Sequence, residues 1–186
     1  MVHTEALWRV HRTVGPYRQR WDQMRTWGPV DSRWDPHPEP PGDDPDSAVM
    51  YAAPEVTPTL GEVFVHRRAI TLSAAHALVG WTPTRALELL DLTGTWAVRN
   101  GASASLHAAP RSTCRRWAQA IRETWPELDG LRAPSTITLR PMVVLFAPAL
   151  DSFPDGPALA RALDHPDLSG VFVDAADSLG WAIRRV

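Results

Sequence analysis

The sequence predicts a single α+β domain, and three observations support this prediction. The chain has 186 residues, a length that suits one domain with one hydrophobic core. Hydrophobic residues make up 44% of the chain and charged residues 22%, both ordinary values for a soluble globular protein. Short strand-like segments are mixed with a few helical segments without regular alternation. Such a mixture is typical of an α+β domain.

The first part of the chain is predicted to contain two strands on either side of an exposed loop. Residues 7–10 resemble a short strand in which Arg9 interrupts the apolar residues, and residues 48–52 resemble a buried strand. Between them, residues 35–47 hold five prolines and five acidic residues in thirteen positions. Such a segment buries too little apolar surface to order itself, so we expect an exposed loop. The loop is either a solvated connector or a flap over a ligand site.

A helix is expected directly after the second strand. Thr57 is a candidate N-cap, and Pro58 suits the first helical position. Apolar residues that we expect to face the core follow at helical spacing, namely Leu60, Val63 and Phe64. Glu62 lies off this stripe, so we expect it to face either water or a cleft.

A second helix has the clearest pattern in the sequence. Its apolar stripe consists of Cys114, Trp117, Ala118, Ile121 and Trp125. Pro126 is expected to end the helix. The opposite face carries several arginines, which are either solvated or part of a binding surface.

The remaining segments are mostly predicted as strands. Residues 73–101 allow two interpretations, either strands over residues 88–92 and 95–98 or a helix over residues 83–90. We expect strands at residues 136–139 and 142–146 and a short helix over residues 155–163. Residues 171–173 and 181–186 are predicted as closing strands.

Composition and motifs exclude several classes of protein. Nineteen basic residues against 21 acidic ones give a net charge of −2, which argues against a general nucleic-acid binder. Cys114 is the only cysteine and lies on an apolar stripe, so we expect a core residue and neither a disulfide nor a cysteine zinc site. The seven histidines are scattered, and no phosphate-binding loop, Gly-x-Ser-x-Gly or His-Glu-x-x-His motif is present, so we expect no metal.

The protein is expected to be soluble and cytoplasmic. The first residues have no basic region followed by an apolar core, as a secretion signal would. The longest apolar run, residues 142–150, is interrupted by Pro148 and is much shorter than the ~20 residues of a membrane-spanning helix.

Five polar or charged residues stand where core packing does not explain them. They are Arg9, Arg33, Tyr51, Glu62 and Ser135. An ion pair, a helix cap or a turn explains each of them alone. The order of all five along the chain is a more specific signal than any one of these residues alone.

In that order they resemble the RES-domain family, which is named for arginine, glutamate and serine. The resemblance runs from about Leu7 to about Pro148. The matching blocks are residues 7–10, 33–36, 49–53, 61–64, 90–94, 113–121 and 129–135. The resemblance implies a fold similar to that of ADP-ribosyltransferases, with central twisted β-sheets flanked by helices. Residues 1–150 would then form an NAD-binding domain, and residues 151–186 would add a helix and a strand to the same domain.

The resemblance also assigns the site residues. Arg9 and Arg33 match the two arginines of the family, Tyr51 its tyrosine and Glu62 its glutamate. Ser135 is the best match for the serine, and Ser32, Ser103 and Ser105 are its competitors. The family usually has Gly-Arg-Trp-Asn where this chain has Ser-Arg-Trp-Asp at residues 32–35, a departure that bears on the local turn.

Many members of the family are toxins of bacterial toxin–antitoxin pairs that attack NAD+. The resemblance therefore implies an NAD+-consuming toxin that cleaves the nicotinamide–ribose bond by hydrolysis or phosphorolysis. NAD+ would be the substrate, and a small helix-turn-helix antitoxin the partner. No direct contact with nucleic acid or membrane is expected, and an oligomer is left open. The alternatives are a protein ADP-ribosyltransferase and an inactive RES-like module that binds a partner.

The implied chemistry suits these residue types. Cleavage of a glycosidic bond passes through an oxocarbenium-like state, whose positive charge the Glu62 carboxylate would oppose while it holds the ribose. The guanidinium groups of Arg9 and Arg33 would grip the pyrophosphate. Tyr51 would stack on the nicotinamide or the ribose, and Ser135 would orient the ribose or the attacking group.

Overall fold

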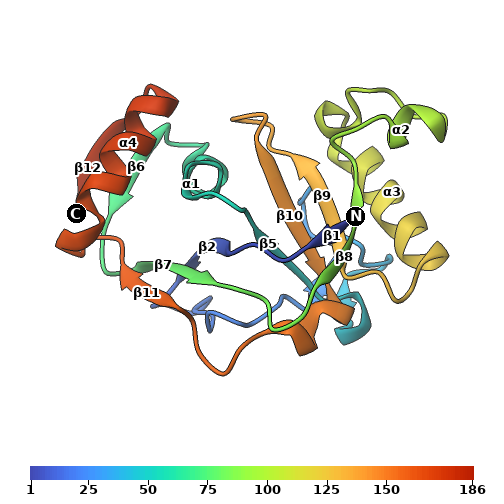
Figure 1. Cartoon of the computed structure of the whole chain (residues 1–186), viewed down its shortest axis with the longest axis horizontal. Helices are drawn as coiled ribbons and strands as arrows, with labels where there is room; N and C mark the ends of the chain where they lie inside the picture. The colour runs from blue at the N-terminus through green and yellow to red at the C-terminus, as the bar shows by residue number, and fades with distance from the viewer.

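Two β-sheets pack against each other at the centre of the fold, in a computed structural model that covers residues 1–186 (Figure 1). The larger sheet has the strand order β1 (Val2–His3), β8 (Leu87–Asp91), β9 (Gly130–Pro134), β10 (Pro141–Phe146), β5 (Val49–Ala52). The smaller sheet has the order β11 (Leu159–Ala162), β7 (His76–Trp81), β2 (Leu7–Arg12). Neighbouring strands of both sheets are antiparallel except β8 and β9, which are parallel.

Two short strand pairs and the helices complete the fold. Strand β6 (Ala69–Leu72) pairs in parallel with β12 (Ala182–Arg185), and β3 (Trp27–Gly28) pairs with β4 (Gly42–Asp43). The α-helices are α1 (Val56–Phe64), α2 (Trp96–Arg99), α3 (Arg111–Thr124) and α4 (Ser169–Leu179). The 3₁₀ helices are η1 (Pro45–Ser47), η2 (Leu106–Ala108), η3 (Ala147–Ser152) and η4 (Pro166–Leu168). None of the helices combines the length and the apolar character that crossing a bilayer requires.

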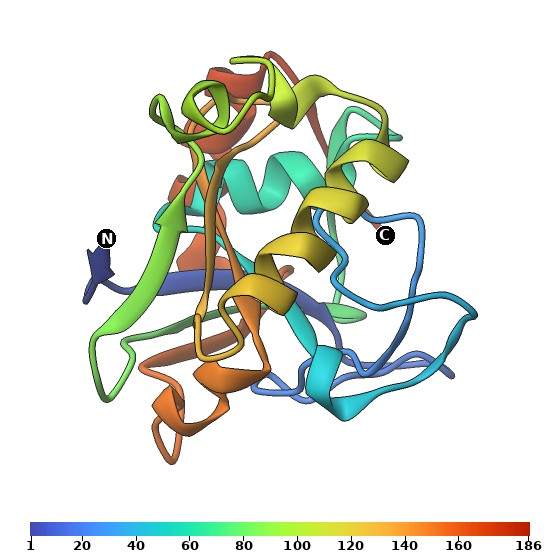
Figure 2. The same ribbon diagram turned by 90° about the vertical axis from the view of Figure 1, so that its right-hand side faces the viewer.

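The helices lie in two groups on opposite sides of the sheets. Figure 1 shows α2 and α3 beside the larger sheet, α4 at the other end of the molecule beside β6 and β12, and α1 between the two groups. In Figure 2, α3 crosses the molecule in front of the larger sheet, and the chain segment that precedes β5 runs beside it. The Gln119 side-chain amide joins the two by donating to the backbone carbonyl of His37 at 2.6 Å.

Strand β10 separates two of the three hydrophobic cores because its side chains alternate between its faces. Val143 and Leu145 are buried between the two sheets, whereas Val144 and Phe146 are buried under α3. The third core holds α1 and α4 against the smaller sheet, with Phe172 fully buried. Each large side chain buried in this way contributes roughly 1.5–3 kcal/mol to stability.

The structure confirms the α+β prediction and the elements with the strongest apolar patterns. Strands occur at or close to the predicted residues 7–10, 48–52, 88–92, 142–146 and 181–186. The helix with the apolar stripe is α3, where Cys114, Ala118 and Ile121 are buried. Trp125 follows its last turn and is 44% exposed.

Several other predicted elements are wrong. Residues 136–139 form a turn and not a strand, with Leu139 at a left-handed φ of 58° and largely exposed. Residues 83–90 are not helical, and residues 95–98 form most of α2 and not a strand. Residues 171–173 belong to α4, whose buried stripe of Phe172, Ala175 and Ala176 has helical spacing. Residues 155–163 contain strand β11, because pairing with β7 completes the smaller sheet.

The start of α1 also differs from the prediction. The helix begins at Val56 with Glu55 as its N-cap, so Thr57 and Pro58 are the second and third helical residues. Leu60 and Phe64 are buried as expected, but Val63 is 41% exposed. Glu62 is half-buried and faces a cleft. The sequence had left open whether it faces a cleft or water.

The proline-rich acidic segment is ordered at both ends, which corrects the expectation of an exposed loop over residues 35–47. Asp35 and His37 are completely buried, and residues 42–43 form β4. Residues 38–41 are the one continuous exposed stretch without secondary structure, while Asp43, Pro45 and Asp46 are exposed within β4 and η1. The prediction failed because composition does not reveal that a buried carboxylate and a buried imidazole hold the start of this segment.

Candidate functional site

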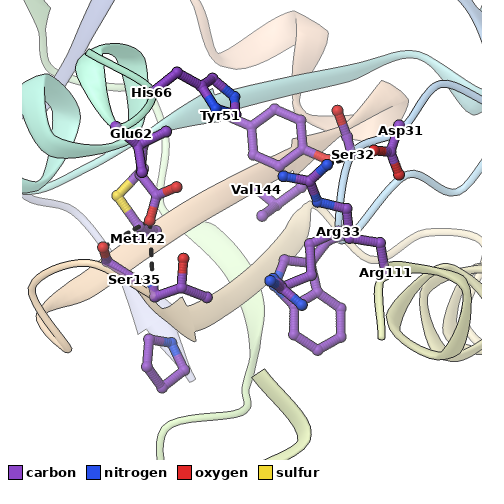
Figure 3. Close-up of a pocket in the computed structure, with 14 residues that line it drawn as sticks. Asp31, Ser32, Arg33, Tyr51, Glu62, His66, Arg111, Ser135, Met142 and Val144 are labelled. Carbon is purple, nitrogen blue, oxygen red and sulfur yellow. Dashed lines mark hydrogen bonds and ion pairs between the residues drawn. The ribbon is translucent and has the colours of Figure 1, made fainter. Parts of the chain in front are cut away.

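A cavity of about 250 Å³ lies where α1, β5, β10 and the start of α3 meet (Figure 3). Its polar lining consists of Asp31, Ser32, Arg33, Tyr51, Glu62, His66, Arg111, Ser135 and Thr136. Four of these residues were predicted from the sequence as site residues, namely Arg33, Tyr51, Glu62 and Ser135. Their positions come from four separate segments of the chain, so only the folded protein brings them together.

Glu62 and Ser135 are in direct contact at one end of the cavity. The Ser135 hydroxyl donates to Glu62 Oε1 at 2.7 Å, and the backbone N–H of Thr136 donates to the same oxygen at 3.1 Å. The second carboxylate oxygen of Glu62 has no hydrogen-bond partner within the protein. The carboxylate is therefore held through one oxygen, and the other remains available to a ligand.

The turn after β9 fixes the direction of the Ser135 hydroxyl. Ser135 is buried, and its oxygen accepts the backbone N–H groups of Ile137 at 3.1 Å and Thr138 at 3.2 Å. With these two donors on the oxygen, its own proton points to Glu62. The competitor Ser32 lines the cavity away from Glu62, whereas Ser103 and Ser105 lie on the exposed loop after α2 and line no part of it.

The opposite end of the cavity carries positive charge. Arg33 donates to the backbone carbonyl of Ala109. Arg111, the first residue of α3, forms an ion pair with Asp31. Arg115, one turn further along α3, lies 3.4 Å from the same Asp31 carboxylate. In Figure 3 Asp31, Arg33 and Arg111 lie across the cavity from Glu62 and Ser135.

Tyr51 lies between the two ends, on the middle of strand β5. Its ring borders the cavity, and its hydroxyl is buried near the Ser32 side chain and the Trp34 backbone without a well-formed hydrogen bond to either. Burial, assisted by the nearby Asp35 carboxylate, raises the pKa of the Tyr51 phenol. The hydroxyl therefore stays protonated and keeps a proton to donate.

A buried network anchors the segment that carries Arg33. The Asp35 carboxylate accepts from Val30 N at 2.7 Å, from Arg25 Nη2 at 3.0 Å and from the backbone N–H of His37 at 3.1 Å. The two ring nitrogens of His37 lie 2.6 Å from Asp35 Oδ1 and 2.8 Å from the Thr26 carbonyl.

Burial alone would raise the pKa of Asp35, but the Val30 N–H, the Arg25 charge and His37 outweigh that effect and hold the pKa below its usual value. Asp35 occupies the position where the resemblance puts an asparagine, so this departure gives the turn a charged and fully paired anchor.

Arg9 lies beside this cavity and not in it. It borders an adjoining cavity of about 220 Å³ that shares Tyr51 and Glu62 with the first. Its guanidinium donates to the carbonyls of Trp21 at 3.1 Å and Gln23 at 2.9 Å and to Gln19 Oε1 at 2.7 Å. Burial lowers the pKa of Arg9 to about 10, so the group remains charged at neutral pH. These bonds hold the segment after β2, and the role of Arg9 toward a ligand stays a prediction.

Sequence reasoning missed four polar residues of the cavity, namely Asp31, His66, Arg111 and Thr136. His66 follows Glu62 by four residues, about one helical turn, so helical periodicity could have predicted that both lie on the same side. Asp31 and Arg111 are 80 positions apart, and no local pattern joins them. Nowhere in the chain do three or more His, Cys, Asp or Glu side chains form a group that could hold a metal ion.

Comparisons with known proteins identify the family of the chain and a similar fold. The family model described as the RES domain matches residues 6–164. Among solved structures, the fold is similar to a chain in the crystal structure of the M. tuberculosis MbcT–MbcA toxin–antitoxin complex, with a TM-score of 0.55 and 18% identity. That match covers 86% of this chain and 84% of the other. A search of curated proteins finds no match.

Proposed function

The chain belongs to the RES-domain family, and on this premise we propose that it is the toxin of a toxin–antitoxin pair and cleaves the nicotinamide–ribose bond of NAD+. Family membership and the similarity to a chain of a toxin–antitoxin complex support the toxin role. The observation that carries the proposed chemistry is the polarity of the cavity. A carboxylate stands at one end, a guanidinium at the other, and an aromatic ring lies between them.

This polarity matches the charges of the nicotinamide half of NAD+. The ribose that becomes positively charged in the transition state would lie at Glu62, and the phosphates would lie toward Arg33. The Tyr51 ring is large enough to support the flat nicotinamide or the ribose. Ser135 would then act through Glu62, since its hydroxyl orients the carboxylate and faces it at 2.7 Å.

In the proposed reaction the bond between the ribose C1′ and the nicotinamide nitrogen breaks, and its electron pair goes to that nitrogen. Nicotinamide leaves as a neutral molecule, and the cationic ribose is stabilised by the Glu62 carboxylate. Water or phosphate then bonds to C1′, and the proton that the acceptor loses passes to solvent. The products are nicotinamide and either ADP-ribose or its 1-phosphate.

Product analysis tests this proposal directly. The purified protein is incubated with NAD+, once in a phosphate-free buffer and once with phosphate, and the products are separated. We expect free nicotinamide together with ADP-ribose or its phosphate ester. Intact NAD+ in both buffers would refute the reaction and favour an inactive module. ADP-ribose found attached to protein would identify a transferase instead.

The proposed partner is a small helix-turn-helix protein that keeps the enzyme inactive. A neighbouring reading frame for such a protein is the expected genetic context. Adding its product to the same assay should stop nicotinamide release, and unchanged release would argue against that pairing.

A further inference from the structure

The positively charged end of the cavity contains a group that the proposed function does not yet use. Arg111, in the first turn of α3, borders the same cavity as Arg33. Figure 3 shows both side chains across the cavity from Glu62, beside Asp31 and Ser32. Two guanidinium groups face one carboxylate there, so this end has an excess of positive charge.

The two guanidinium groups are held in different ways. Arg33 is tied to the backbone carbonyl of Ala109 and touches the buried Cys114, which fixes its position. Arg111 has a single partner, the carboxylate of Asp31. The Asp31 side chain is 72% exposed, and exposed ion pairs contribute little free energy. Arg111 can therefore exchange this partner for another anion at small cost.

A phosphate group is the anion that suits this arrangement. Planar guanidinium groups bind phosphate oxygens through paired, charge-assisted hydrogen bonds. Arg9 is less suited to this task, since its guanidinium already donates to Trp21, Gln23 and Gln19. The cavity places Arg33 and Arg111 on the side away from the carboxylate that would hold the ribose.

We infer that Arg111 is a substrate-binding residue that releases Asp31 and grips a phosphate of the nucleotide together with Arg33. This inference rests on the proposed function, because a dinucleotide is the ligand that would bring a phosphate to this point. Asp31 then competes with the ligand for Arg111 and sets how tightly phosphate is bound.

Three variants test the inference by calorimetric binding of ADP-ribose, a probe that needs no turnover. Arg111→Ala should weaken binding by about ten- to a hundredfold, the range for loss of hydrogen bonds to a charged group. Asp31→Asn should strengthen it up to about fivefold, since it removes both the competitor and a repelling charge. Arg115→Ala is the matched control, because Arg115 also faces Asp31 but does not border the cavity. It should bind ADP-ribose as the wild type does.

The outcomes separate the two proposals. Wild-type affinity in Arg111→Ala, or a loss of the same size in Arg115→Ala, would overturn the role of Arg111 alone. A lowered melting temperature in Arg111→Ala together with weaker binding would indicate a structural role, and it would also overturn the inference. If the wild type does not bind ADP-ribose, the phosphate site falls, and nicotinamide release in the product analysis still decides the cleavage. If it binds in an Arg111-dependent way but leaves NAD+ intact, the cleavage is refuted and the phosphate site remains.

Discussion

At the scale of single residues, the hydrogen bond between Ser135 and Glu62 explains why a serine is needed at this turn. Its hydroxyl satisfies two backbone N–H groups and still presents its proton to the carboxylate. A buried group with that many partners is costly to remove, because the partners are left unpaired. Ser135 is therefore placed to position the Glu62 carboxylate.

Ser135→Ala should accordingly lower both stability and turnover. The N–H groups of Ile137 and Thr138 would lose their acceptor, and Glu62 would lose its strongest donor. We expect a loss of about 1–3 kcal/mol in the free energy of unfolding, with slower nicotinamide release. Denaturant unfolding and the NAD+ assay measure the two effects. Ser105→Ala, on an exposed loop, is the control and should change neither. A variant Ser135→Ala as stable as the wild type would contradict the buried network.

At the scale of elements, the pairing of β3 with β4 holds both ends of the segment that carries Arg33. Within it, the His37 ring packs closely against the backbone of Gly28. A Cβ atom at Gly28 would lie 2.4 Å from Cγ of the buried His37 ring. His37 cannot move aside freely, because Asp35 and the Thr26 carbonyl hold both of its ring nitrogens. Only glycine therefore fits at this position.

Gly28→Ala should destabilise the fold and disturb the ligand site together. Overpacking of this kind typically costs about 1–3 kcal/mol, and the shift would pass along the segment to Arg33. We expect a lower melting temperature and weaker binding of ADP-ribose. Gly42→Ala is a matched control, since Gly42 faces Gly28 across the hairpin and its Cβ would have no neighbour nearer than 3.9 Å. Equal melting of both variants would disprove the steric argument.

The position of the exposed stretch of residues 38–41 favours a connector over a flap. None of its residues borders either cavity, and the chain is anchored on both sides by buried His37 and by β4. Deleting Glu39 and Pro40 should therefore leave the KM for NAD+ within about twofold of the wild type. Steady-state kinetics and a melting curve check this. A clear rise in KM at unchanged melting temperature would favour the flap.

At the scale of the whole molecule, the sequence predicted those elements whose apolar pattern is complete in itself. Helix α3 and strand β10 are examples, because each buries a continuous stripe of its own residues. The apolar pattern did not predict β11, which is a strand because it pairs with β7. It also did not predict that the start of the acidic segment is buried. Local sequence does not contain these long-range contacts.

The same division holds for the candidate site. The order of Arg33, Tyr51, Glu62 and Ser135 along the chain was enough to mark them, and the fold brings all four to one cavity. Arg111 was not predicted, because it precedes the apolar stripe from which the helix was predicted. Its relation to Asp31 exists only after α3 has packed on the larger sheet.

The central claim, that Glu62 assists cleavage of NAD+, is tested most directly by comparing nicotinamide release in the wild type and in Glu62→Gln. Glutamine keeps the size and an oxygen that can accept from both Ser135 and Thr136, so unfolding should change by no more than about 0.5 kcal/mol. Loss of the charge should slow turnover about a hundredfold or more. Glu55→Gln, at the exposed start of the same helix, should turn over normally. Nicotinamide release at the wild-type rate in Glu62→Gln would contradict the account.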